Sequence, residues 1–190
     1  MSVMAVMPRD TNEWTVDDLD AIPDDGLQYE LIDGVLVVSP APVPRHQRVV
    51  LELAVVLHAR CPADLEVFVA PLDFRPDRRN SLQPDVCVVR RSAVGEKNLQ
   101  LPPLLAVEVL SPSTRRKDLM LKRSVYEDRG VASFWYVDPD EQSFLAWDLV
   151  DGRYVEVAKA VGEQTVTVSR PYEVSFRPSD LVQGRSGGAT

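Results

Sequence analysis

The spacing of apolar residues predicts two long helices in the middle of the chain. Between residues 45 and 60 apolar side chains recur at helical spacing, and Pro62 is expected to end that helix. A second helix is expected over residues 115–129, with capping side chains in Ser111–Thr114 and a stop at Gly130. The two helices would lie on either side of a series of strands.

Apolar runs between turn residues predict those strands. The run Leu104–Leu110 is apolar except for one glutamate, which is typical of a central strand covered on both faces. Tyr29–Val38 is predicted to be a hairpin, because Asp33-Gly34 divides two apolar runs. The polar segment Asp77–Leu82 is expected to be a turn, and Thr15–Leu19 a short helix that Thr15 caps. Further strands are expected at residues 65–70, 86–89, 132–137, 144–149, 154–158 and 165–168.

The order helix, strand, strand, strand, helix, strand predicts an α/β fold in which helices flank a mixed β-sheet. An N-terminal hairpin precedes this core and C-terminal strands follow it. Neither an internal repeat nor a linker divides the sequence, so residues 1–183 are expected to form one domain and residues 184–190 a flexible tail.

The composition restricts the class of protein. The net charge of −8 argues against a general nucleic-acid binder, because phosphate neutralisation supplies most non-specific affinity. The cysteines Cys61 and Cys87 are too few for a disulfide scaffold or a zinc cluster, and each is predicted to be a small buried side chain. This use of cysteine is typical of proteins in a reducing cytoplasm. The first residues lack the basic segment of a signal peptide, and apolar runs are too short to cross a membrane. A soluble, cytoplasmic protein is expected.

Three charged residues are candidates for chemistry. Glu108 lies in the central strand and points to the face opposite Val107 and Val109. Burying an ionised carboxylate in such a strand costs free energy unless the carboxylate is paired or binds a cation. It is therefore either half of a structural ion pair or a metal ligand. Asp85 follows Pro84 at the start of a strand, where a turn role is also common. Lys122 lies within the apolar arc of the second helix, where it would either extend to the surface or reach a carboxylate.

Together these side chains suit phosphodiester hydrolysis. Two carboxylates on adjacent strands can hold Mg²⁺ or Mn²⁺, which prefer oxygen ligands. Such a cation lowers the pKa of water and offsets charge on a phosphoryl oxygen, and a nearby ammonium stabilises the negative charge of the transition state.

The same residues resemble the PD-(D/E)XK nuclease signature, in which Pro84-Asp85 is followed by a glutamate, here Glu108. More specifically, the chain resembles the Uma-two family of restriction-type endonucleases. The matching stretches are Tyr29–Gly34, Ser39–His46, Gln83–Val86, Val107–Thr114, Lys122–Tyr126 and Gly130–Pro139, of which Val107–Thr114 is the most specific.

The resemblance implies a restriction-endonuclease-like core and a divalent-metal-dependent endonuclease acting on DNA. The superfamily pattern places a lysine two residues after the glutamate, where this chain has Leu110, and the resemblance suggests that Lys122 replaces it, with Lys117 as the competitor. The Tyr-Glu pair before the hairpin accompanies the active site in the family, so Glu30 is a candidate metal or water ligand, although it could equally be a solvated strand residue. The implied site is Glu30, Asp85, Glu108 and Lys122, with the three acids as metal ligands. Related nucleases often pair, so a homodimer is expected.

Other polar residues are less specific. His46 could contact a phosphate or be structural, and Gln83 could orient a water molecule or be only a loop residue. Asp73 and Asp77 match the motif less well and are predicted to be turn and surface residues, whereas Trp135-Tyr136 is expected in the core. Two basic groups could meet phosphates or form a solvated face: Arg78, Arg79, Arg90 and Arg91, and Arg115, Arg116, Lys117 and Arg123.

Three functions remain open at this point. The chain could be a metal-dependent endonuclease, a catalytically inactive nuclease-fold module for binding or assembly, or a small-molecule phosphohydrolase. The acidic charge allows the second and the third. The intact carboxylates together with Lys122 favour the first.

Overall fold

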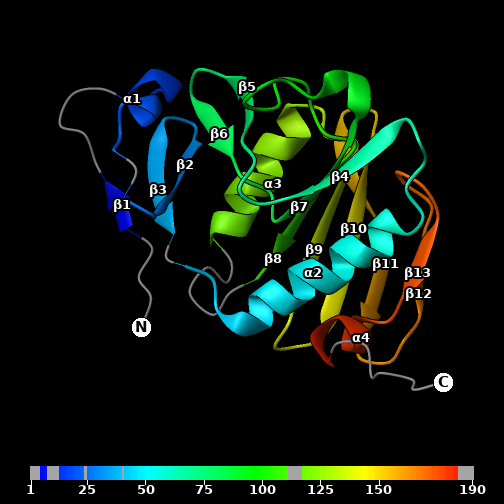
Figure 1. Cartoon of the computed structure of the whole chain (residues 1–190). Helices are drawn as coiled ribbons and strands as arrows, with labels where there is room; N and C mark the ends of the chain where they lie inside the picture. The colour runs from blue at the N-terminus through cyan, green and yellow to red at the C-terminus, as the bar shows by residue number, and fades with distance from the viewer. Residues whose placement is uncertain (1–4, 8–12, 24, 40, 111–116, 184–190) are drawn as a thin grey trace.

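The computed structural model describes residues 5–7, 13–23, 25–39, 41–110 and 117–183. A six-stranded sheet lies at its centre, with the strand order β11-β10-β9-β8-β7-β4 (Figure 1). Its strands are β4 (Leu65–Val69), β7 (Val86–Arg90), β8 (Leu105–Val109), β9 (Ser133–Asp138), β10 (Ser143–Val150) and β11 (Arg153–Val161). β8 and β9 are parallel and the other neighbours are antiparallel, so the prediction of a mixed sheet is confirmed.

The two predicted helices lie on opposite faces of this sheet. Helix α2 (Pro44–His58) covers one face and helix α3 (Lys117–Asp128) connects the parallel strands β8 and β9 across the other. The order α2, β4, β7, β8, α3, β9 is the predicted core order. Because β8 is covered on both faces, all five of its residues are buried, including its glutamate.

The face under α2 holds the larger part of the core. Val49, Val50, Leu53 and Leu57 of α2 pack at helical spacing against the valines of β7 and β8. The hairpin of β12 (Val166–Val168) and β13 (Val174–Phe176), together with helix α4 (Pro178–Gln183), joins the same cluster. Strand β13 and helix α4 were not predicted from the sequence.

A second, smaller sheet packs with α3 on the other face. Its order is β1-β3-β2-β6-β5, from β1 (Ala5–Met7), β2 (Gln28–Ile32), β3 (Val35–Ser39), β5 (Phe74–Asp77) and β6 (Asn80–Leu82). The predicted hairpin of β2 and β3 is confirmed, and its turn residues Asp33 and Gly34 have φ values of 49° and 80°. Helix α1 (Val16–Asp20) is also confirmed, with Thr15 in a capping box.

The prediction that Asp77–Leu82 is a turn is largely wrong. Only Arg78 and Arg79 connect β5 to β6, and Asn80–Leu82 is a buried strand. The polar residue Asn80 can be buried there because its side chain accepts the Asp33 N–H at 2.9 Å and donates to Asp77 at 3.1 Å. The link between β6 and β7, residues Gln83–Asp85, carries the chain from the small sheet to the large one.

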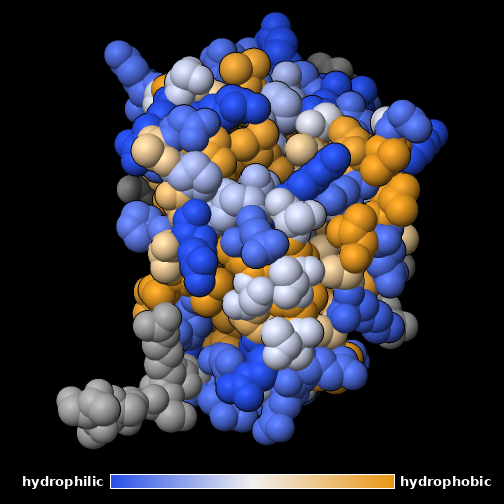
Figure 2. Space-filling model, turned by 90° about the vertical axis from the view of Figure 1, so that its right-hand side faces the viewer, coloured by the Kyte–Doolittle hydropathy of each residue, from blue (hydrophilic) through white to orange (hydrophobic). Residues whose placement is uncertain are grey.

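Some expectations lie outside the described residues, namely the capping residues Ser111–Thr114, Arg115, Arg116 and the tail 184–190. Within the part of the chain that is described, no helix is long and apolar enough to span a membrane. Figure 2 shows apolar patches among hydrophilic residues on the face at the right-hand side of Figure 1.

Candidate active site

The four predicted site residues come from four separate elements. Glu30 is on β2 of the small sheet, Asp85 immediately precedes β7, Glu108 is on β8, and Lys122 is on α3. Glu30, Glu108 and Lys122 are buried, with exposed fractions of 6%, 6% and 8%. The site therefore lies where the two sheets and α3 meet.

Strand alternation directs Glu108 into this space. Val107 and Val109 point to the α2 side, whereas Ala106 packs on the α3 side, the side to which Glu108 also points. The Tyr126 hydroxyl donates to Glu108 Oε1 at 2.8 Å, and Lys122 Nζ donates to Oε2 at 3.0 Å. Both oxygens of the buried carboxylate thus have a partner.

Lys122 lies between two carboxylates. Its Nζ is 2.8 Å from Glu30 Oε1 and 3.0 Å from Glu108 Oε2. Of the two alternatives that the sequence left open, the lysine reaches carboxylates and does not extend to the surface. Val125 and Tyr126 are buried on the same face of α3, whereas Leu121, which the helical spacing placed on one flank, is 53% exposed.

Glu30 is held in place by the link between β6 and β7 and by helix α3. The backbone N–H of Gln83 donates to Glu30 Oε1 at 2.7 Å, and the same oxygen faces Lys122. Its burial shows that Glu30 is not a solvated strand residue. Together with Glu108, it holds the ammonium of Lys122.

Asp85 is the most exposed of the four, with 18% of its side chain accessible. Its Oδ2 accepts the backbone N–H of Val109 at 2.7 Å, which ties it to β8. His46 Nε2 lies 3.3 Å from the same oxygen. Asp85 therefore borders the cluster on the side of α2.

Burial and neighbouring charges both shift the pKa values of the side chains in this cluster. Burial raises the pKa of Glu108, and the charges of Asp85 and Glu30 add to this effect, while Lys122 opposes it. Burial lowers the pKa of Lys122, but attraction by Glu108 and Glu30 outweighs burial and raises it, so the lysine stays charged. Burial also raises the pKa of Tyr126, which keeps its hydroxyl protonated as a donor. Three acids facing one ammonium leave an excess of negative charge.

Comparison with known proteins identifies the family of this chain. The Uma2 family model, described as "Putative restriction endonuclease", matches residues 16–179. The chain belongs to the Uma2 family. The match includes all four site residues and supports a nuclease.

A solved structure shares the fold of this Uma2 chain. It is described as a "putative nuclease belonging to DUF820 from Anabaena variabilis ATCC 29413" and superposes with a TM-score of 0.68 at 20% sequence identity. The alignment covers 89% of this chain and 97% of that chain. None of the curated proteins compared matches the chain. The expected nuclease-type α/β fold is thus confirmed.

The Uma2 site contains contacts that sequence reasoning did not identify. Tyr126 follows Lys122 by one helical turn, so its position on the same face was a usable signal for its contact with Glu108. Gln83 had no such signal, because its bond to Glu30 depends on the packing of β2 beside β6. Tyr136, expected in the core beside the fully buried Trp135, is only half-buried and pairs in register with Glu108.

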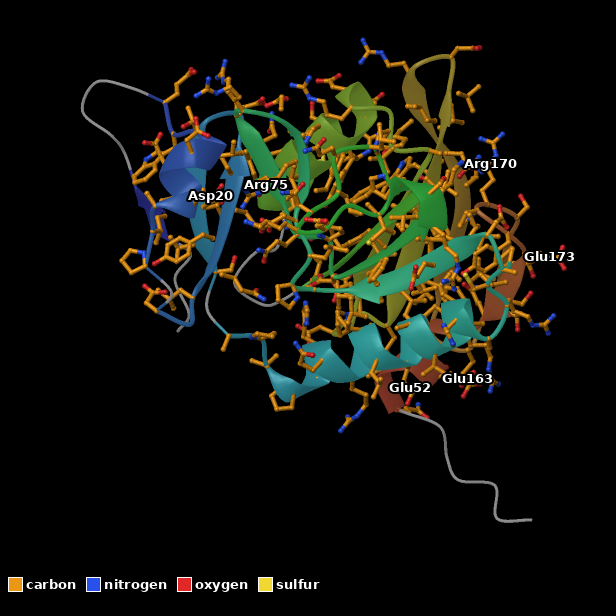
Figure 3. The ribbon with its side chains drawn as sticks, turned by 45° about the horizontal axis from the view of Figure 1, so that its top comes forward. Asp20, Glu52, Arg75, Glu163, Arg170 and Glu173 are labelled. Atoms are coloured by element: carbon orange, nitrogen blue, oxygen red, sulfur yellow. The ribbon has the colours of Figure 1, made fainter. Side chains whose placement is uncertain are left out.

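A chain of polar contacts leads outward from Gln83. Its Nε2 donates to Asp73 Oδ1 at 2.7 Å, and Asp73 Oδ2 accepts from Arg75 Nη2 at 2.7 Å. Arg75 Nη1 in turn contacts Asp20 at 2.8 Å (Figure 3). Asp73, predicted to be a turn residue, therefore supports the site, whereas Asp77 forms an ion pair with Arg129 at 2.7 Å.

The predicted basic groups do not form one free surface in the described residues. Arg78 and Arg79 are exposed and form ion pairs with Asp17 and Glu13. The guanidinium of Arg123 lies over the rings of Trp147 and Tyr154, at 5.2 and 5.4 Å. Of the competitor Lys117, only the backbone is described.

The donors available for a cation are two neighbouring carboxylates. Among the described residues, no three His, Cys, Asp or Glu side chains gather closely enough to hold a metal ion. Asp85 precedes β7 and Glu108 lies on the adjacent antiparallel strand β8; burial is the main cause of the raised pKa of Glu108, and the Asp85 charge adds to it. This oxygen donor set and its excess negative charge fit a hard divalent cation that completes its coordination with water.

Proposed function

We propose that this Uma2 protein is a divalent-metal-dependent endonuclease that hydrolyses phosphodiester bonds in DNA. The observation that carries the proposal is the convergence of Asp85, Glu108 and Lys122, with the ammonium buried 3.0 Å from Glu108. A lysine on α3 thus reaches the glutamate of β8, although the signature position two residues after that glutamate holds Leu110.

Each side chain has a role that follows from its contacts. Asp85 and Glu108 would hold Mg²⁺ or Mn²⁺, while Glu30 anchors Lys122. When bound, the cation lowers the pKa of water and offsets charge on the phosphoryl group. An ammonium has three hydrogens, and two of those of Lys122 point to Glu30 and Glu108. The third can donate to the attacking water or to a phosphate oxygen and stabilise negative charge there.

The family supports the proposed substrate, and analogy with related nucleases supports the proposed assembly. The family is described as "Putative restriction endonuclease", so DNA is the proposed substrate. The net charge of −8 implies weak non-specific affinity, and the cation would compensate for part of it at the site. A homodimer, which would place two sites on the two strands of a duplex, and a reducing cytoplasmic location are further parts of the proposal.

The test is nicking of supercoiled plasmid by the purified protein in Mg²⁺ or Mn²⁺. Glu108→Gln and Lys122→Met keep the side-chain size but remove the charge. Each is expected to lower the nicking rate by about 100-fold or more, because removing one stabilising group from an active site commonly costs that much. Chelation of the metal should have the same effect on the wild type.

Matched controls are Glu66→Gln and Lys159→Met, which change the same residue types outside the site. Lys159 is exposed on β11, and Glu66 lies on β4, where it contacts Arg91. These variants should nick at the wild-type rate. Equal nicking by all five proteins would indicate a contaminant and contradict the proposal. Absence of nicking in the wild type, with no metal bound on titration, would favour a catalytically inactive module.

A further inference from the structure

His46 contacts the site from helix α2, on the opposite side from Lys122. The imidazole is buried, with an exposed fraction of 7%, and its Nε2 lies 3.3 Å from Asp85 Oδ2. Because an ionised carboxylate can only accept, a hydrogen bond between these two atoms requires the hydrogen to be on Nε2. The four-residue site does not account for this contact.

Two donors converge on one oxygen of Asp85. The backbone N–H of Val109 donates to Oδ2 at 2.7 Å, and His46 Nε2 approaches the same atom. A second donor at the same oxygen would restrict rotation of the carboxylate further than one hydrogen bond does. The second oxygen, Oδ1, would then be held more closely in one orientation relative to Glu108.

The helix end that carries His46 is itself fixed to the large sheet. Arg45, its neighbour, donates through Nη2 to Pro139 O at 2.6 Å and through Nη1 to Asp140 Oδ1 at 3.0 Å. Pro139 and Asp140 belong to the turn between β9 and β10. Val49 and Val50, one turn further along α2, are in the core. The imidazole is thus presented by a rigid element, as accurate positioning requires.

The other ring nitrogen argues against a packing role. Nδ1 of His46 is buried and has no hydrogen-bond partner among the described residues. A buried polar atom without a partner costs about 1–3 kcal/mol. A leucine or phenylalanine would fill the same space without that cost. Packing alone therefore does not account for a histidine at this position, whereas its contact with Asp85 does.

We propose that His46 is a positioning residue, whose Nε2–H holds Oδ2 of Asp85 and so orients this carboxylate for the divalent cation that it would share with Glu108. This inference rests on the proposed function, because it assumes that Asp85 and Glu108 bind the cation. Loss of a hydrogen bond that orients a metal ligand commonly lowers metal affinity by about 10- to 100-fold.

The test is titration calorimetry of Mn²⁺ into the full chain, which needs no activity. His46→Gln places an amide nitrogen where Nε2 is, whereas His46→Asn places one where Nδ1 is. We expect His46→Leu and His46→Asn to weaken Mn²⁺ binding about 10- to 100-fold, and His46→Gln to stay within about threefold of the wild type. His58→Leu changes the only other histidine, exposed at the end of the same helix, and should have no effect.

The two amide variants keep the inference testable if the leucine variant fails to fold, because both introduce an uncharged amide at one position. Equal Mn²⁺ affinity in the wild type, His46→Asn and His46→Gln would overturn the positioning role while the proposed metal site stands. Equal weakening by Asn and Gln would also overturn it, because the Nε2 position would then not matter. No Mn²⁺ binding by the wild type would overturn the proposed metal site first, and this inference with it.

Discussion

At the scale of single residues, the burial of Lys122 between two carboxylates is the least expected feature. A buried ammonium is costly unless its partners compensate, and here Glu30 and Glu108 do so. Strand alternation and helical spacing made Glu108 and Lys122 candidates from the sequence, and the resemblance to the Uma-two family implied that they form a site with Asp85. The sequence could not predict the roles of Gln83 and Asp73, since these depend on how two sheets pack.

Glu30 allows a residue-scale prediction that separates two roles. Glu30→Gln keeps an oxygen that can accept the Gln83 N–H but removes the charge that attracts Lys122. We expect the nicking rate to fall roughly 10-fold, which corresponds to about 1.4 kcal/mol. The Mn²⁺ affinity should stay within about threefold of the wild type, because Glu30 anchors the lysine.

Calorimetry beside Asp85→Asn checks this distinction, since that variant removes a proposed ligand and should abolish Mn²⁺ binding. If Glu30→Gln loses Mn²⁺ affinity to the same extent as Asp85→Asn, then Glu30 is a third metal ligand, as the family resemblance implied.

At the scale of elements, the predictions succeeded where apolar periodicity was strong. Helix α2 and strands β7, β8 and β9 were all predicted within a few residues of their observed bounds. Strands β5 and β6 were not, because side-chain bonds of Asn80 satisfy a polar segment that would otherwise be a loop. Periodicity reports burial of apolar groups, and it carries no information about polar groups that find partners far along the chain.

The chain contains two Asp-Gly hairpin turns that make a matched pair. Asp33-Gly34 has φ values of 49° and 80°, and Asp151-Gly152 has 50° and 78°. A Cβ on Gly34 would lie 2.8 Å from Glu13 Cβ, whereas one on Gly152 would meet nothing within 4 Å. Both alanine variants are expected to lose about 1–2 kcal/mol through the left-handed backbone, and Gly34→Ala to lose more through the added contact.

Urea unfolding of the two variants measures this difference directly. Gly34→Ala should also reduce nicking, since its turn positions β2 and with it Glu30. Equal losses of stability would mean that the chain around Glu13 moves aside at little cost.

At the scale of the whole molecule, the excess negative charge of the site couples metal binding to stability. Mn²⁺ at about 100 times its dissociation constant should stabilise the wild type by about 2.7 kcal/mol. For a domain of this size that corresponds to a rise in Tm on the order of 5–10 °C. Asp85→Asn should lose this rise, and in chelator it should be at least as stable as the wild type, because one of three crowded acids is neutralised.

Thermal unfolding with chelator and with Mn²⁺ tests both parts of this prediction. Asp64→Asn, an exposed aspartate before β4, is the matched control and should follow the wild type in both conditions. A rise in Tm that is as large in Asp85→Asn as in the wild type would place the cation elsewhere on the protein.

The assembly of the site from both sheets and α3 has a consequence during protein synthesis. Glu30 and Asp85 leave the ribosome well before Glu108, and Lys122 follows later still. A nascent or prematurely terminated chain that ends after β7 carries two of the acids without the lysine or the glutamate of β8. Under the proposed function, such a partial chain lacks two of the four site residues and is expected not to cut nucleic acid.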